Sequence, residues 1–344
     1  MAATARAAYL VAPRTIELRR EPIPVPGPGA VVVAVRVALT DGTDLKAWRR
    51  GHREMPFPSR FGHEFAGDVL AVGPDVTAFA PGDRMATVHS APDGTCFWCL
   101  RGEEELCATV MTTKLLGAYA EYVLVPAHVV ARNAFVMPAG MGYERAAFLE
   151  PLACVVHAQR RLSARPGDVV AIVGDGGFGM LHALVARATG LRPVLIGRRP
   201  ERAALARELG IADVLDARSD DVRAELDART AGRGADAAIE ATGSAEVWQA
   251  APALVRRGGT VSLFGGLPAG TRVGYDAARL HYDEVTLQGP FHFTPAAVRA
   301  AFELLSSAAL PVERLIGARF ALDDIAAAFE ALDGGMPLKL AIVP

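Results

Sequence analysis

The sequence lacks the features that would direct a protein to a membrane or to nucleic acid. No apolar stretch reaches the roughly 20 residues of a membrane span, and the start, MAATARAAYLVAPRTIELRR, is too mixed for a signal peptide. Long blocks of one charge sign are also missing, and 36 basic residues nearly balance 38 acidic ones, for a net charge of −2. We therefore expect a cytoplasmic protein with no nucleic-acid partner and no membrane partner.

Cysteine is scarce and unevenly placed. Three of the four cysteines lie in one short segment, DGTCFWCLRGEEELC. A disulfide framework would spread cysteine pairs along the chain. The clustering instead favours a metal site or reduced thiols. The fourth, Cys154, lies in an apolar stretch of helical spacing, where packing is the expected role.

Apolar residues are plentiful, and their pattern changes along the chain. At 344 residues with 51% hydrophobic content, about two domains are expected. Up to about residue 150 the pattern is β-rich, as in AVVVAVRVAL. Beyond it, short apolar strands alternate with helical segments, which predicts an α/β fold with a doubly wound parallel sheet. From about residue 292, two helices and a final strand are expected.

A glycine-rich turn lies between a predicted strand and a predicted helix in VAIVGDGGFGMLHAL. Small residues let the backbone approach a pyrophosphate, and the helix N-terminus supplies amide donors. The pattern predicts a dinucleotide loop, and an ordinary tight turn is the alternative. The expected loop residues are Gly174, Gly176, Gly177, Phe178 and Gly179.

The end of the next predicted strand indicates which nucleotide binds. An acidic residue there would bind the ribose 2′-hydroxyl of NAD, but this strand ends in Gly197, followed by Arg198 and Arg199. Guanidinium groups pair well with a phosphate, so NADP is favoured and NAD is the alternative. The arginines could also be solvated, and Arg202 could assist them or cover the surface. Three residues at later strand ends are expected near the nicotinamide half: Thr242, Gly265 and Gly266.

Several longer segments carry a resemblance to a known family. They include FGHEFAGDVLAVGPDVTAFAPGDRM, AAFLEPLA, the glycine loop and LKLAIVP. Over nearly its whole length the chain resembles the medium-chain dehydrogenase/reductase family, in its zinc-dependent alcohol and polyol branch. EPLA and LHYDEVTLQG are closer to sugar-alcohol and threonine dehydrogenases.

The resemblance implies two domains. A GroES-like β-rich catalytic domain would comprise residues 1–152 and 292–344, with a zinc lobe at about 90–110. A Rossmann cofactor domain would comprise residues 153–291. The resemblance also implies a homodimer or homotetramer, paired through an edge strand that we assign to GGTVSLFGG.

The resemblance further implies a catalytic zinc. His63 would be a direct ligand, Glu64 a ligand or a close neighbour of one, and Glu150 a further carboxylate. The family's usual cysteine is replaced by Asp41. Aspartate binds zinc, but the harder ligand set would select zinc less strongly and admit manganese. Loss of the metal is the alternative.

The cysteine segment matches the family's structural zinc lobe with one departure. Cys96, Cys99 and Cys107 keep their places, whereas Asp93 stands at the first cysteine position. Three thiolates and a carboxylate can complete a tetrahedron around zinc. A metal-free loop with free thiols is the alternative.

Other positions acquire roles from the same resemblance. Thr43 would begin the proton relay, and Asp44 would be a structural hydrogen-bonding residue. Lys46 stands where a relay histidine is common, and it would need a lowered pKa to act as a base; contact with ribose or substrate, or simple solvation, is the alternative. Lys339 would reach the cofactor pyrophosphate, unless it is a solvated strand residue.

These expectations define one function and two competitors. The first is a zinc-dependent oxidoreductase that transfers a hydride between NADP(H) and a secondary alcohol or ketone, with a polyol, sugar or cyclitol-like substrate. A metal-free NADPH-dependent reductase of activated C=C bonds would explain Asp41 and Asp93 together. A non-catalytic NADPH-binding regulator is the third interpretation. The basic segment KAWRRGHREMPFPSR either receives an anionic or heavily hydroxylated substrate or is a solvated loop; its basic residues are Arg49, Arg50, His52, Arg53 and Arg60.

Overall fold

The computed structural model describes residues 3–52, 55–335 and 337–344, which form two compact units. The first comprises Met1–Ala153 with Phe293–Pro344, and the second comprises Cys154–His292. Helix α5 (Leu149–Arg160) begins in the first unit and ends in the second. Within the described residues, no helix combines the length and the apolar character needed to cross a membrane.

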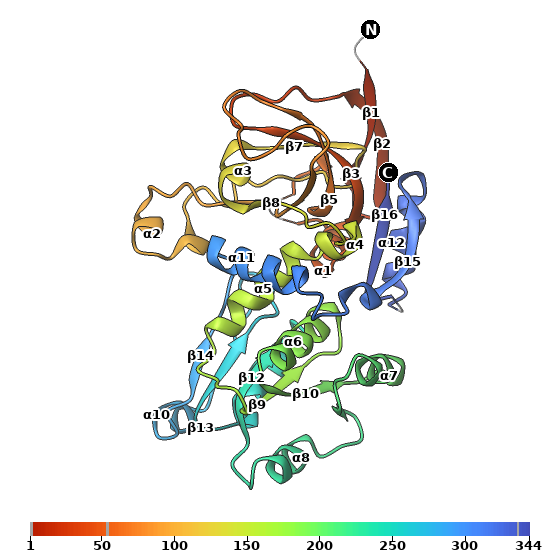
Figure 1. Ribbon diagram of the computed structural model, residues 1–344. Coiled ribbons are helices and arrows are strands. Elements are labelled where there is room, and N and C mark those ends of the chain that lie inside the picture. Colours follow the sequence, from red (N-terminus) through yellow and green to blue (C-terminus); the bar gives the residue numbers. More distant parts are fainter. Residues whose placement is uncertain (1–2, 53–54, 336) are drawn as a thin grey trace. The chain divides into compact units, whose positions relative to one another are not determined.

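The first unit is built on a sheet whose described strands run in the order β15-β16-β3-β5-β6-β8, with β7 also paired to β3 (Figure 1). Their bounds are β3 (Val31–Leu39), β5 (Glu64–Val72), β6 (Arg84–Thr87), β7 (Tyr122–Val125), β8 (Ala134–Val136), β15 (Ile316–Ala321) and β16 (Lys339–Val343). A smaller sheet has the order β2-β1-β4, with β1 (Thr4–Ala12), β2 (Thr15–Pro22) and β4 (Ser59–Arg60). The central strand β3 is buried at seven of its nine positions, which accounts for its nearly continuous run of valine.

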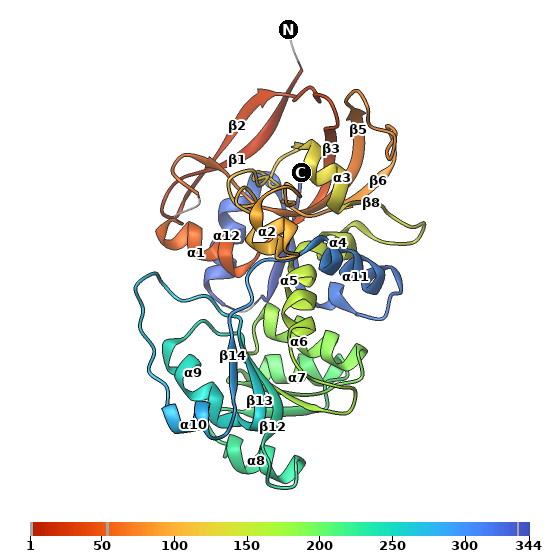
Figure 2. The ribbon, with the colours of Figure 1, turned by 90° about the vertical axis from the view of Figure 1, so that its left-hand side faces the viewer.

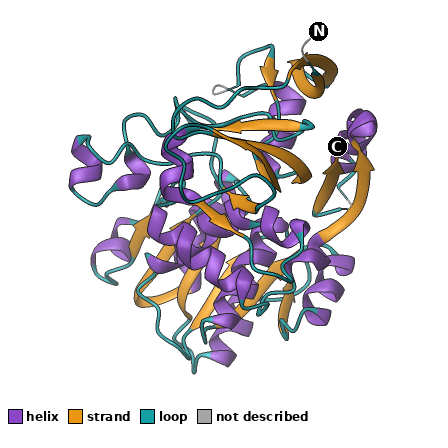
Figure 3. Ribbon diagram, turned by 45° about the horizontal axis from the view of Figure 1, so that its top comes forward, coloured by secondary structure: helices purple, strands orange, loops and turns teal. Residues whose placement is uncertain are grey.

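Helices and long loops complete this unit, as the colouring by secondary structure shows (Figure 3). The helices are α1 (Gly42–Arg50), α2 (Phe97–Leu100), η1 (Glu104–Leu106), α3 (Ala127–Asn133), α4 (Tyr143–Ala147), α11 (Pro295–Ser306), η3 (Val312–Leu315), η4 (Leu322–Asp324) and α12 (Ile325–Asp333). Helix α12 buries Ile325, Ala328, Phe329 and Leu332, a spacing that places them on one face. Phe329 packs against Phe61 in the core of the unit, with ring centroids 5.0 Å apart.

The pairing of four strands brings distant segments to one edge of this sheet. Leu39, the last residue of β3, pairs with Glu64, the first of β5, and also with Ala341 in β16. Strand β6 is antiparallel to β5 in turn. The ends of β3 and β6 and the starts of β5 and β16 therefore lie close together, and the candidate metal ligands are found at this edge.

The second unit contains a parallel sheet with the described order β11-β10-β9-β12-β13-β14. Its strands are β9 (Val169–Val173), β10 (Arg192–Gly197), β11 (Asp213–Asp216), β12 (Ala235–Glu240), β13 (Val255–Leu263) and β14 (Thr286–Gln288). Its helices are α6 (Gly177–Ala188), α7 (Pro200–Glu208), α8 (Val222–Arg229), α9 (Ala245–Ala250), η2 (Ala251–Leu254) and α10 (Ala277–His281). Helices α6 and α7 lie on one side of the sheet and α9 on the other (Figure 2). The predicted doubly wound sheet is confirmed, and its order reverses beside β9, where ligands bind in such folds.

One predicted edge is wrong. The segment GGTVSLFGG, which forms most of β13, is not at the edge of the sheet, because Thr260 and Val261 pair with Thr286 and Leu287 of β14. The short strand in LHYDEVTLQG supplies the outermost position on that side.

Candidate metal centre and dinucleotide loop

Three buried side chains converge where the four strand ends meet. Asp41 follows β3, His63 precedes β5 and Glu150 lies in the first turn of α5. The Nε2 atom of His63 is 3.9 Å from Asp41 Oδ2 and 3.9 Å from Glu150 Oε2. Two ligands of a tetrahedral zinc are separated by roughly 3.4 Å at usual bond lengths. His63 Nε2 is thus close to this spacing from each of the two carboxylates, and His63, Glu64 and Glu150 also form a group whose ligand atoms lie within 4.8 Å of one another.

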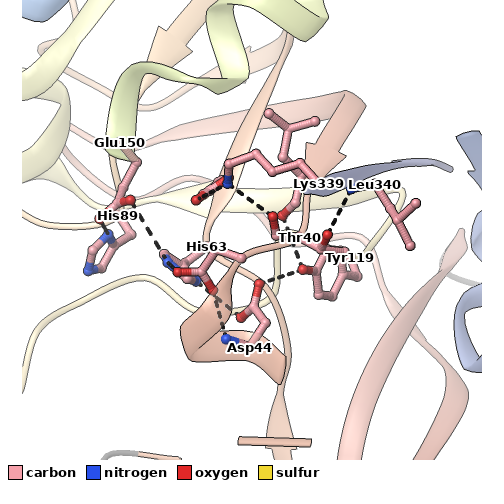
Figure 4. A network of polar contacts seen from close by, with 11 residues as sticks. Thr40, Asp44, His63, His89, Tyr119, Glu150, Lys339 and Leu340 are labelled. Carbon is pink, nitrogen blue, oxygen red and sulfur yellow. Dashed lines mark hydrogen bonds and ion pairs between the residues drawn. The ribbon is translucent and has the colours of Figure 1, made fainter. Parts of the chain in front are cut away.

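The imidazole of His63 is oriented by a carboxylate on its other side. Its Nδ1 atom is 3.2 Å from Asp44 Oδ1, and the Tyr119 hydroxyl donates to Asp44 Oδ2 at 2.5 Å (Figure 4). A partner at Nδ1 leaves Nε2 to face Asp41 and Glu150. An outer carboxylate of this kind fixes the tautomer and the ring orientation of a metal-binding histidine.

Asp41 has a second function in the local fold. It is the N-cap of α1, and its Oδ1 accepts the backbone N–H of Asp44 at 2.7 Å. The Asp-Gly-Thr-Asp sequence thus starts the helix and holds the Asp41 carboxylate, leaving Oδ2 toward His63. A cysteine at this position would be a poorer cap.

Glu64 and Lys339 form a buried ion pair beside these residues. The Lys339 ammonium is 2.7 Å from Glu64 Oε1, and Lys339 is only 3% exposed. The ammonium is also 3.0 Å from the carbonyl oxygen of Thr40 (Figure 4). Contact of Lys339 with the cofactor pyrophosphate stays a prediction, whereas the structure shows the Lys339 ammonium against Glu64. The reason is that β16 pairs antiparallel to β3, which sets the start of β16 next to Thr40 within the first unit.

The charges of this group suit a divalent cation. Burial opposes the charged imidazole, yet the carboxylates of Asp44 and Asp41 raise the pKa of His63 well above its ordinary value. Burial raises the pKa of Glu64 well above its ordinary value, although Lys339 opposes the shift. Burial would also raise the pKa of Asp41, but His63 and Lys339 bring it below its ordinary value. The group holds more carboxylates than cationic partners, an imbalance that a bound cation would correct.

His89 belongs to the same group, although the sequence analysis missed it. It follows β6, and its Nδ1 is 3.4 Å from Glu150 Oε1. Its ring meets that of His63 edge to face, with centroids 5.1 Å apart. His89 could not be found from the sequence, because the pairing of β6 with β5 brings it to this place.

The two remaining predicted relay residues differ in their exposure. Thr43 lies in α1, two residues after Asp41, and is half-buried, whereas Lys46 is exposed about one turn further along. Lys46 is exposed to solvent rather than buried with the other candidate residues, so the geometry does not favour it as a base.

The cysteine lobe brings its four predicted ligands together. One ligand atom each from Asp93, Cys96, Cys99 and Cys107 lies within 4.8 Å of all the others. The backbone N–H groups of Thr95 and Cys96 bind the Asp93 carboxylate and hold its pKa well below its ordinary value. Burial raises the pKa of Cys99 to about 12, a cost that a bound cation would offset. The donor set and its closeness fit a structural metal.

The glycine loop has the space that a pyrophosphate requires. A Cβ atom on Gly179 would lie 1.7 Å from the carbonyl oxygen of Gly174, so only glycine allows this close passage of α6. A Cβ on Gly176 would meet nothing within 4 Å, which leaves the N-terminus of α6 open. Phe178 packs against Phe264, with ring centroids 5.0 Å apart. The loop therefore fits a dinucleotide.

The other predicted cofactor residues lie at strand ends of the same sheet. Thr242 follows β12, and its hydroxyl and amide both donate to the Glu240 carboxylate. A Cβ on Gly265 would lie 2.3 Å from the amide nitrogen of Gly243, whereas Gly266 has open space. Thr242 and Gly265 therefore make contacts that shape the ends of these strands.

The turn that follows β10 contacts Asp175, a residue of the glycine loop that the sequence analysis did not weigh. Arg198 and Arg199 are exposed after Gly197, as the NADP hypothesis requires. Their backbone N–H groups, however, donate to the Oδ2 atom of Asp175, from the glycine loop. Arg202 is also close to this carboxylate, with Nη1 3.5 Å from Oδ1.

Comparison with known proteins gives a consistent result. The family described as alcohol dehydrogenase GroES-like domain matches residues 27–135, and the zinc-binding dehydrogenase family matches residues 177–307. Sorbitol dehydrogenase of Bacillus subtilis (strain 168) is 30% identical over 325 residues, covering 92% of this chain and 90% of that protein. L-threonine 3-dehydrogenase of Chelativorans sp. (strain BNC1) is 29% identical over 324 residues, covering 92% of each.

Solved structures agree over almost the full length. A zinc-binding dehydrogenase from Sinorhizobium meliloti 1021, bound to NADP, has a TM-score of 0.90 and 31% identity, covering 99% of this chain and 100% of that one. Alcohol dehydrogenase TADH from Thermus sp. ATN1 has a TM-score of 0.90 and 29% identity, covering 98% and 99%.

The fold, the metal group and these relatives together define a zinc-type dehydrogenase. The chain belongs to the medium-chain dehydrogenase/reductase family, in its zinc-type alcohol and polyol dehydrogenase branch. It is an NAD(P)-dependent oxidoreductase that transfers a hydride to or from alcohol-type substrates.

Proposed function

We propose that the protein interconverts a secondary alcohol and a ketone with NADP(H), at a divalent cation held by Asp41, His63 and Glu150. The observation that carries this proposal is the pair of 3.9 Å separations that His63 Nε2 makes with the two carboxylates. Zinc is the expected ion, and manganese is an alternative because two of the three ligands are oxygen.

The residues around the cation have distinct tasks. When bound, the cation supplies Lewis acidity that favours an alkoxide, and the nicotinamide supplies the hydride acceptor or donor. Asp44 holds the His63 ring, and the helix cap holds the Asp41 carboxylate. Lys339 neutralises Glu64, which leaves Glu64 a close neighbour of the cation rather than a ligand. The Thr43 hydroxyl starts the path by which the alcohol proton leaves.

The cysteine lobe is assigned a structural zinc. The closeness of Asp93, Cys96, Cys99 and Cys107 supports it. Four protein ligands would complete the tetrahedron and leave no open position for a substrate, so this metal serves folding rather than chemistry.

A neutral, hydroxylated substrate is favoured over an anionic one. In the basic segment, Arg49 pairs with Asp333, and Arg60 pairs with Glu21 at 3.0 Å. These guanidinium groups already have carboxylate partners within the fold, whereas Arg53 lies outside the described residues. A polyol, sugar or cyclitol-like alcohol fits such a site better than an acid does, and relatives named for sorbitol and L-threonine support a polar substrate.

NADP is proposed as the preferred nucleotide. Gly197 leaves no carboxylate at the end of β10, and the exposed side chains of Arg198 and Arg199 follow it. A 2′-phosphate would pair with these guanidinium groups. The NADP-bound relative from Sinorhizobium meliloti supports this assignment.

The protein is also proposed to form a homodimer or homotetramer through the edge of the parallel sheet. With β13 covered on that side, the pairing strand would be β14. The measurement is the molar mass in solution, and a monomer would contradict it.

The experiment for the catalytic centre combines metal analysis with an alcohol screen. Purified protein should contain a divalent cation at this centre and oxidise one or more polyols with NADP. The Asp41→Cys variant should keep zinc but bind manganese less well, because thiolate is a softer ligand. Full turnover by rigorously metal-free protein would overturn the proposal and favour a metal-free reductase.

A further inference from the structure

Asp175, the second residue of the glycine loop, makes contacts that an ordinary loop residue would not need. Its Oδ2 atom accepts the N–H groups of Arg198 at 2.9 Å and Arg199 at 3.0 Å. Its Oδ1 atom is 3.5 Å from Arg202 Nη1. A half-buried carboxylate from the end of β9 is thus held against the turn that follows β10.

The position of this carboxylate coincides with that of a missing side chain. A Cβ atom on Gly197 would lie 2.5 Å from Asp175 Oδ2. In doubly wound dinucleotide folds, the residue ending the second strand supplies the acidic group that binds the ribose 2′-hydroxyl. Gly197 ends that strand here, and Asp175 fills the space where an acidic side chain at position 197 would begin. A carboxylate that follows the neighbouring strand β9 therefore occupies the place of an acidic side chain at position 197.

This arrangement affects the two nucleotides in opposite ways. A carboxylate accepts a hydrogen bond from a ribose hydroxyl, whereas it repels the charge of a 2′-phosphate. Asp175 also occupies two backbone N–H groups that a phosphate would otherwise bind. The adjacent cavity, of about 230 Å³, is lined by Asp175 together with Gly197, Arg199 and Asp216. The carboxylates of Asp175 and Asp216 in this lining repel a 2′-phosphate, whereas the exposed arginines attract it.

We propose that Asp175 is a cofactor-specificity residue, the acceptor for the adenosine ribose 2′-hydroxyl. It gives the protein affinity for NAD and limits the preference for NADP that Arg198 and Arg199 create. The inference rests on the proposed cofactor site, and it assigns that site an acidic determinant which the Gly197-Arg198-Arg199 turn alone would not indicate.

The test is the ratio of NADPH to NADH affinity, measured by fluorescence titration without substrate. Asp175→Asn keeps a side-chain oxygen that accepts the two N–H groups but removes the charge. The variant should bind NADPH at least as tightly as the wild type and NADH more weakly, so the affinity ratio should rise about tenfold. The matched control is Asp213→Asn, which removes one charge at the start of β11, opposite Val194 rather than Gly197. Its ratio should equal that of the wild type.

The outcomes separate this inference from the NADP proposal. An unchanged ratio in Asp175→Asn, or equal weakening of both nucleotides, would show that Asp175 only caps the turn and would overturn the inference. A wild type that binds NADH more tightly would overturn the NADP preference, yet a tenfold rise in Asp175→Asn would still support the role of Asp175. Failure of the wild type to bind either nucleotide would overturn both.

Discussion

At the scale of single residues, the site depends on how buried charges are paired. Lys339 and Glu64 are both nearly inaccessible to solvent, at 3% and 0% exposure. Neither charge is tolerable in the interior without the other, because desolvation of a lone ion costs several kcal/mol. The pair therefore places a fixed positive charge close to the proposed metal ligands, where it limits the excess of negative charge.

Replacing only one partner of this pair should destabilise the first unit. Lys339→Met leaves the Glu64 carboxylate buried without its partner, and the expected loss is about 3–5 kcal/mol in the free energy of unfolding. Urea denaturation monitored by far-UV circular dichroism measures it. Adding Glu64→Gln to Lys339→Met should recover most of the loss. Equal stability of wild type and Lys339→Met would show that the ion pair does not form.

A buried histidine in the second unit should make stability depend on pH. His182 lies in α6 with 0% exposure, and burial lowers the pKa of its imidazole to about 3. The unfolded chain binds this proton near pH 6.5, so stability contributed by His182 is complete above that pH and is lost as the pH falls toward 3. At pH 5 the loss should be about 2 kcal/mol relative to pH 7.5.

The check is a comparison of unfolding free energies at these two pH values. In His182→Leu this component of the pH dependence should disappear, because leucine does not titrate. The exposed His281 offers a matched control, and His281→Asn should behave as the wild type does. A wild type and a His182→Leu variant with the same difference between pH 7.5 and pH 5 would refute the prediction.

At the scale of elements, the cysteine lobe has little apolar packing of its own. Helix α2 has only four residues and buries none of them, and Phe97 and Leu100 are 64% and 77% exposed. So short a helix has no intrinsic stability in water. The side chains of Asp93, Cys96, Cys99 and Cys107 are consequently the main candidates for what holds the lobe together.

Cys99→Ser should therefore lower the melting temperature by several degrees and release one equivalent of zinc, because a structural metal contributes folding energy. Differential scanning calorimetry and elemental analysis provide the two measurements. Cys154→Ser changes a thiol outside the lobe and should retain all the metal. The prediction fails if Cys99→Ser keeps both the wild-type metal content and the wild-type melting temperature.

At the scale of the whole molecule, the two binding functions are built separately. The proposed metal ligands Asp41, His63 and Glu150 belong to the first unit, whereas the glycine loop belongs to the second. The proposed metal ligands depend on strand pairings within the first unit, such as that of β16 with β3. The glycine loop depends on strand pairings within the second unit, such as that of β10 with β9.

Removal of metal should consequently abolish turnover while leaving nucleotide binding nearly intact. After dialysis against a chelator, the affinity for NADPH should remain within about threefold of the untreated value, a change below 1 kcal/mol. Fluorescence titration measures the affinity, and addition of zinc should restore activity. A large loss of NADPH affinity on chelation would show that the two functions are coupled.

Much of the architecture was predictable from local patterns. The alternation of apolar strands and helices predicted the doubly wound sheet, because burial on both faces requires nearly continuous apolar strands. The glycine loop could be located because glycine is required where α6 passes the backbone of Gly174. His63, Asp41 and Glu150 were identified by the family resemblance, and the structure sets His63 close to each of the two carboxylates.

Only the tertiary structure decided the partners of these residues. Lys339 was predicted at the pyrophosphate, but the pairing of β16 with β3 sets it against Glu64. His89 and Asp175 attracted no prediction, because their neighbours Glu150 and Gly197 are distant in sequence and meet them only in the tertiary structure. By itself, the sequence determined which segments become strands, helices and glycine turns, since those depend on side-chain periodicity and backbone freedom. The register between strands depends on long-range packing, and it decided which charges meet.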